Sequence, residues 1–182
     1  MGTTADSIDA DARAFIEAQH LFFVATAPGG SEGHVNLSPK GLDGTLAVLD
    51  EATVAYLDLT GSGIETVAHA RDNGRICLLF CAFAGAPKIL RLHGQAEALE
   101  PHQPEFAALR AHFSDVPAER SIVRVRVTRV ATSCGYGIPL FEYQGQREIL
   151  PKWGRARGPD GVQAYQREHN LRSIDGLAGL SE

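Results

Sequence analysis

The sequence is poor in sulfur. Its three cysteines, Cys77, Cys81 and Cys134, are odd in number and show no CxxC spacing, so they indicate neither a disulfide framework nor a zinc ribbon. If Cys77 and Cys81 share one strand, they lie about 13 Å apart, which is too far for a disulfide. We therefore expect reduced thiols and a cytoplasmic protein.

Long apolar runs and an excess of positive charge are also missing. No apolar run approaches the roughly 20 residues of a membrane helix, and residues 1–15 are acidic without an apolar signal core. The net charge of −5 and the pI of about 5.8 disfavour general nucleic-acid binding. We expect neither a membrane nor a nucleic acid as a partner.

Motifs of self-sufficient catalysis are absent as well. The sequence has no HExxH, no paired-histidine spacing, no Ser-His-acid arrangement and no GxGxxG after a first strand. His34 and His69 are isolated, so we predict no metal site. Any chemistry is therefore expected to come from a bound cofactor.

The sequence does contain regularly punctuated strand patterns. With 182 residues, 44% of them hydrophobic, it can bury a large core without staples. Apolar or alternating runs predict strands at 21–27, 34–38, 45–49, 53–59, 75–83, 88–99 and 121–131. Helical spacing predicts helices over 7–19, 64–72 and 101–113. The fold class is mostly β with small helices (α+β), a barrel of six or seven mostly antiparallel strands.

The character of the chain changes after residue 132. We predict a barrel domain over 1–132 and a helical C-terminal extension over 133–182 that wraps the barrel or a partner subunit. Two short helices are expected, at 151–157 and 159–170. Residues 145–172 hold six cations against three acids, whereas residues 1–60 hold nine acids and two cations.

Two chain breaks are candidates for holding an anion. Lys40 follows a strand in Ser38-Pro39-Lys40-Gly41, where a charge and turn donors can meet a phosphate. The alternative is a turn lysine in water. Thr60-Gly61-Ser62-Gly63 precedes a helix whose free N–H groups suit an anion. Ser62 and Glu65 also match a capping box, so a plain helix cap is the alternative there.

Two further features leave alternatives open. Arg91, His93 and Gln95 alternate onto one strand face, where they are either solvated or in contact with a ligand or another subunit. Trp153 lies in the basic tail and either closes over a ligand ring or simply packs.

The order of these pieces resembles the pyridoxamine 5′-phosphate oxidase-like, FMN-binding split-barrel superfamily. The matching stretches are FFVATA, HVNLSPKGLDG, VAYLDLTGSG with its helix, NGRICLLF and KILRLHGQAEAL. The resemblance implies a split barrel and a homodimer with FMN in a groove between subunits. By position, the residues lining the ring and ribityl chain would be Val35, Asn36, Leu37 and Ser38. Lys40, Thr60 and Ser62 would hold the phosphate, and Arg91 and Gln95 would approach from the second subunit.

The same resemblance implies an FMN-dependent oxidoreductase that acts on a small organic substrate. Two alternatives remain: a reductase that uses the deazaflavin F420 in the same groove, and a non-catalytic binder of haem or flavin. In the haem case His34, His69 or His93 would be an axial ligand. One departure from the family pattern is Glu65, which stands near a position where many members carry a cation.

Overall fold

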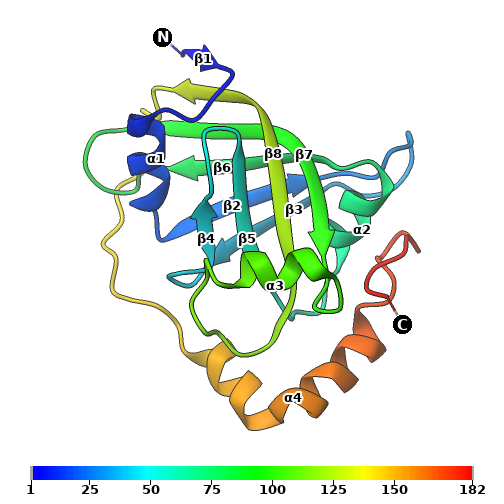
Figure 1. The fold of residues 1–182 in the computed structure, drawn as a ribbon. Helices are drawn as coiled ribbons and strands as arrows, with labels where there is room; N and C mark the ends of the chain where they lie inside the picture. The colour runs from blue at the N-terminus through cyan, green and yellow to red at the C-terminus, as the bar shows by residue number, and fades with distance from the viewer. Residues whose placement is uncertain (1, 182) are drawn as a thin grey trace.

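The computed structural model describes residues 2–181, and its single sheet curls into an open barrel (Figure 1). Seven strands follow the order β3-β2-β6-β7-β8-β5-β4, each antiparallel to its neighbour, and β1 pairs with β8. The predicted split barrel is confirmed, with β1 as an unexpected addition. The strands are β1 Thr4–Ala5, β2 Leu21–Thr26, β3 Asn36–Gly41, β4 Leu46–Val48, β5 Thr53–Leu59, β6 Arg75–Cys81, β7 Ile89–Leu99 and β8 Glu119–Ser133.

In the described part of the chain, four helices accompany the sheet: α1 Ala10–Glu17, α2 Glu65–Asp72, α3 Pro104–Arg110 and α4 Ile149–His169. The predicted Ser62–Glu65 capping box is wrong. Ile64 occupies the cap position of α2 without a side-chain cap hydrogen bond, because Ile64 is buried against Val67 and Leu180 and thereby sets where the helix begins. Within residues 2–181, no helix combines the length and the apolar composition that crossing a membrane would need.

The barrel interior is filled by inward-facing residues in register across the strands. Val24, Leu78, Leu92 and Val130 form one such row, and all four are buried. The β7–β8 register then shifts between His93 and Gly94, which changes which residues of β8 face inward. In a regular strand, residues five positions apart face opposite sides of the sheet. Because of this bulge, Val125 and Val130 both point into the core.

The chain after β8 runs down one side of the barrel to α4, which lies across the barrel's end (Figure 1). Gly158, with φ 67°, and Pro159 break α4 into two helical pieces, as the sequence predicts, because proline lacks the N–H that would continue the helix. After α4 the chain returns toward α2, where Leu180 joins Ile64 and Val67 in one apolar cluster. The Leu180 N–H donates to the carbonyl oxygen of Asn170 at the end of α4. The division into two domains at residue 132 stays a prediction.

The bulge gives Gly94 a testable role. A Cβ atom at this position would collide with the Arg126 carbonyl oxygen across the strand pair. Gly94→Ala is therefore expected to lower the free energy of unfolding by about 1–3 kcal/mol in urea denaturation, as overpacked sites do. Gly137→Ala is the matched control, since a Cβ there meets nothing within 4 Å. Equal unfolding midpoints for the two variants would contradict this interpretation.

Candidate functional site

A cavity of about 910 Å³ lies between the barrel and the C-terminal extension. Its walls are mainly apolar and aromatic, with Leu57 and Leu59 from β5 facing Leu150, Trp153 and Tyr165 from α4. Its charged side chains are Lys40 and Arg147, and no Asp or Glu of the described chain borders it. A mainly apolar cleft with a few convergent polar groups is typical of a small-molecule site, and here the charge favours an anion.

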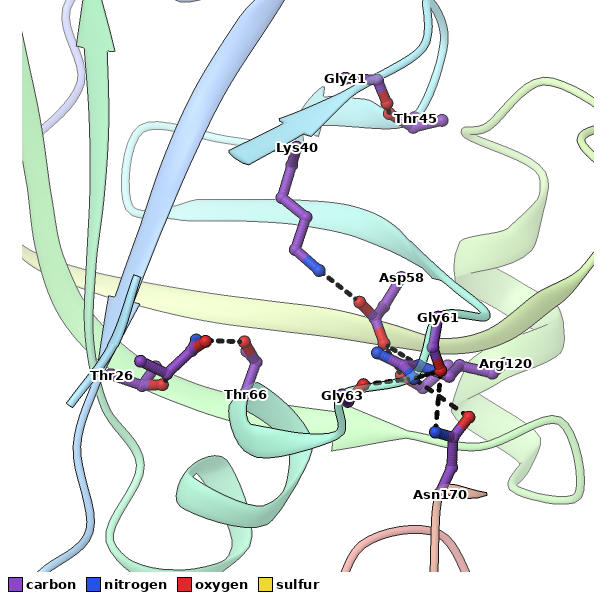
Figure 2. Close-up of polar contacts among 12 residues, drawn as sticks. Thr26, Lys40, Gly41, Thr45, Asp58, Gly61, Gly63, Thr66, Arg120 and Asn170 are labelled. Atoms are coloured by element: carbon purple, nitrogen blue, oxygen red, sulfur yellow. Dashed lines mark hydrogen bonds and ion pairs between the residues drawn. The ribbon is translucent and has the colours of Figure 1, made fainter. Parts of the chain in front are cut away.

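Lys40 is held by a buried carboxylate at the edge of this cavity. Its Nζ donates to Asp58 Oδ1 at 2.8 Å, while Arg120 Nε donates to Asp58 Oδ2 at 2.6 Å. Figure 2 shows the two cations on either side of Asp58. β3 and β5 are not neighbours in the sheet, so the Lys40–Asp58 ion pair links two strands that are not hydrogen-bonded to each other.

The trio of Lys40, Asp58 and Arg120 carries a net positive charge. Burial alone would raise the pKa of Asp58, but the charges and hydrogen bonds of Arg120 and Lys40 lower it well below its usual range. Asp58 is therefore ionised at neutral pH, and one negative charge faces two positive ones. The trio therefore carries a net charge of +1. Lys40 presents this charge to the cavity, and its side chain is 19% exposed.

Arg120 also fastens the extension to the turn that follows β5. Its Nη1 donates to the Gly63 carbonyl oxygen at 2.7 Å and to Asn170 Oδ1 at 3.1 Å. Asn170 Nδ2 donates to the Gly61 carbonyl oxygen at 2.9 Å (Figure 2). One turn earlier in α4, Gln166 Nε2 donates to Thr60 Oγ1 at 2.7 Å. The turn and the extension therefore form one hydrogen-bonded unit beside the cavity.

A second cavity, of about 650 Å³, borders the other end of β3 and the start of α2. Glu65 lies on its wall and accepts a hydrogen bond from the Ile174 N–H at 3.4 Å. A carboxylate therefore already stands at the N-terminus of α2, where an anion would otherwise be favoured. Arg172 is the cation of this cavity.

The structure divides the predicted site residues among several places. Lys40 and Thr60 border the larger cavity. Four residues border the smaller one: Val35, Asn36, Leu37 and Ser62. The two predicted anion-binding segments therefore meet at one cavity through Lys40 and Thr60, while Ser62 faces the other.

Three of the predicted residues lie apart from both cavities: Ser38, Arg91 and Gln95. Ser38 Oγ is buried and has no hydrogen-bond partner in the described chain. Arg91 and Gln95 lie on the outer face of β7, where Arg91 Nη1 donates to Ser133 Oγ at 3.2 Å. Asn36 reaches the smaller cavity, but its amide donates to Thr66 Oγ1 at 3.1 Å and so ties β3 to α2.

The three histidines considered as haem ligands have different surroundings. His34 Nδ1 lies 2.7 Å from Asp175 Oδ1. His69 is buried, its Nδ1 lies 2.9 Å from Thr26 Oγ1, and burial lowers its pKa. His93 lies on the outer face of β7. Across residues 2–181, no three His, Cys, Asp or Glu side chains gather as a metal ion would require.

Sequence reasoning missed Asp58, Arg120, Gln166 and Asn170. Asp58 did carry a signal in the sequence, because it interrupts the otherwise apolar β5. An acid in such a strand needs a buried partner, and in the structure Asp58 is fully buried. The partners gave no local signal, since Arg120 is 62 residues away from Asp58 in sequence.

Asp58→Asn is expected to lower the free energy of unfolding by about 3–5 kcal/mol at neutral pH, because two largely buried cations lose their counter-charge. The pKa of Asp58 is lower in the folded chain than in the unfolded one. The ionised carboxylate therefore stabilises the folded chain fully above the unfolded pKa of about 4, and this contribution to the free energy of unfolding is lost as the pH falls further. The difference between wild type and variant should therefore narrow below about pH 4 in urea denaturation.

Asp6→Asn is the control for this experiment, since Asp6 is exposed, and it should leave the unfolding free energy unchanged. A wild-type advantage over Asp58→Asn that stays constant down to a pH of about 3 would contradict the assigned role of the carboxylate.

Comparison with known proteins places this geometry in a family. Residues 8–134 match the pyridoxamine 5′-phosphate oxidase family. The pyridoxamine 5′-phosphate oxidase family protein ustO of Aspergillus flavus is 36% identical over 193 residues, which cover 96% of this chain and 76% of that protein. Because the alignment covers 96% of this chain, it includes most of the C-terminal extension.

Solved structures show the same fold at lower identity. HupZ of Group A Streptococcus superposes with a TM-score of 0.52 and 22% identity, covering 68% of this chain and 91% of its own. A FAD-binding protein from Mesorhizobium loti gives a TM-score of 0.53 and 17% identity, covering 72% and 95%. By family match and by its likeness to ustO, this chain belongs to the pyridoxamine 5′-phosphate oxidase family.

Proposed function

We propose that this protein binds FMN in the larger cavity and transfers a hydride or electrons between the flavin and a small organic substrate. The observation that carries the proposal is the composition of that cavity. It offers an apolar and aromatic wall for a ring system, and its charged side chains, Lys40 and Arg147, are both cationic. A phosphorylated ring compound matches both halves of this surface.

Lys40, Thr60 and Gly61 form the anion-binding end of the cavity. A lysine ammonium has three donors, and Asp58 accepts one of them, which leaves Lys40 able to donate to a phosphate as well. Thr60 Oγ1 accepts from Gln166, so its own proton remains available for donation. The net +1 charge of the Lys40–Asp58–Arg120 trio would be neutralised by the ligand.

The rest of the cavity would orient the ring and exclude water. Bound FMN would supply the redox chemistry itself. Leu57, Leu59 and Leu150 line the cavity with aliphatic surface, and such surface favours burial of a flat ring over contact with solvent. Family membership supports the proposal, and so does the FAD-binding protein from Mesorhizobium loti that shares the fold.

We further propose that two copies pair through the outer face of the sheet. Leu37 of β3 shares this face with Ala25 of β2 and Cys77 of β6, because the three lie opposite one another in register. Val35 and Leu37 are 76% and 67% exposed, which is typical of an interaction surface when apolar residues adjoin. Arg91 and Gln95 continue the same face and would then approach the partner's site.

Titration of the full chain with FMN tests the cofactor assignment. Lys40→Ala is expected to weaken FMN binding about 10- to 150-fold, the range for one hydrogen bond to a charged group. Riboflavin, which lacks the phosphate, should bind wild type and variant alike. Equilibrium dialysis measures both dissociation constants.

Lys88→Ala serves as the matched lysine control, since Lys88 lies over the Phe15 ring and does not border the cavity. A thermal melt shows whether Lys40→Ala is folded at the temperature of dialysis. Unchanged FMN affinity in folded Lys40→Ala would refute the assignment of Lys40.

The dimer proposal predicts that Leu37→Asp converts the protein to a monomer in analytical ultracentrifugation, because a charge would be buried without a partner in the centre of the interface. Leu140→Asp is the control: Leu140 is 75% exposed and lies in the extension, outside the sheet. Identical sedimentation of wild type and Leu37→Asp, whether both are monomers or both are dimers, would overturn this interface.

A further inference from the structure

Trp153 has an unusual position for the single tryptophan of a chain. It is half-buried, yet it belongs to none of the hydrophobic clusters of the described residues. It borders the larger cavity instead, together with Tyr165 from the second half of α4. Its aromatic surface is therefore not used up in core packing.

The two rings are fixed relative to each other. Trp153 and Tyr165 meet edge to face, with ring centroids 5.2 Å apart and an interplanar angle of 80°. The Arg157 guanidinium lies 5.3 Å from the Trp153 ring and 5.6 Å from the Tyr165 ring, and Arg157 does not border the cavity. The cation therefore supports the aromatic pair without occupying the cavity.

The pair is also fixed relative to the anion-binding end. Gln166, next to Tyr165 in sequence, donates to Thr60 Oγ1 at 2.7 Å and to the Glu119 carbonyl oxygen at 3.1 Å. Asn170, one turn further on, is buried and bonded to the turn after β5. Aromatic wall and anion-binding end are thus parts of one rigid frame, and their separation is set before any ligand arrives.

We propose that Trp153 and Tyr165 form a ring-binding subsite that the extension adds to the barrel. The ligand class is a planar heteroaromatic ring that carries an anionic group: the ring packs on the aromatic pair while the anion meets Lys40. This inference rests on the proposed function in taking FMN as the ligand. It goes further in assigning recognition of the ring to α4, which lies outside the barrel match at residues 8–134.

Ring and phosphate can be tested separately with FMN, riboflavin and inorganic phosphate on the full-length protein. Because Trp153 is the only tryptophan, the wild-type tryptophan emission comes from this residue, and its quenching reports that a flavin has bound. FMN and riboflavin should both quench it, and phosphate should not. Trp153→Leu should weaken FMN and riboflavin binding about tenfold or more in equilibrium dialysis, while Trp153→Phe should retain most of the affinity.

Tyr136→Leu is the matched control, since Tyr136 is 82% exposed and does not border the cavity, and it should bind both flavins as wild type does. FMN binding that depends on Lys40 but not on Trp153 would refute the subsite and leave the proposed function standing. Binding of riboflavin but not FMN would support the subsite and refute the phosphate site. A wild-type protein that binds neither flavin would refute both.

Should Trp153→Leu fail to fold, Tyr165→Leu removes the other ring of the pair. A loss of affinity for both FMN and riboflavin in this variant supports the subsite. Wild-type affinity for both flavins refutes it.

Discussion

The burial of one carboxylate, that of Asp58, governs the arrangement of this molecule. An ion removed from water costs several kcal/mol unless well-placed partners compensate for it. Asp58 has two cationic partners from different strands, Lys40 on β3 and Arg120 on β8. Since β3 is an edge of the open sheet, the Lys40–Asp58 ion pair ties this edge to β5. Arg120 then directs its remaining donors to the turn after β5 and to Asn170, so the same charge also positions the extension.

The extension changes what kind of site the barrel can form. An open barrel alone offers β3 and β5 as one wall of a groove. In this chain α4 supplies the facing wall, with Trp153 and Tyr165 on it, and its attachment through Gln166 and Asn170 makes that wall part of the folded monomer. A site whose two walls belong to one folded chain loses less conformational freedom on binding than one assembled from mobile parts.

Local patterns in the sequence predicted most of the fold, because strand alternation and turn residues act over short distances. The strands predicted at 21–27 and 34–38 do pair with each other, as do those predicted at 45–49 and 53–59, and Gly158-Pro159 does break α4. The site was less predictable. Lys40 was identified from its place after a predicted strand, but its bond to Asp58 depends on how the sheet curls. Asn170 at a helix end resembles any ordinary helix terminus, and only tertiary structure reveals its contact with Gly61.

The two cavities along β3 differ in charge, and this difference decides which of them suits an anionic ligand. The smaller has Glu65 on its wall beside the N-terminus of α2, so the helix dipole is already offset by the protein's own carboxylate. The larger has Lys40 and Arg147 and, within residues 2–181, no carboxylate. Glu65 stands near the position where the family resemblance would place a cation, whereas Lys40 and Thr60, to which the same resemblance assigns the phosphate, both border the larger cavity. An anion is therefore favoured beside Lys40 and the extension rather than at the start of α2.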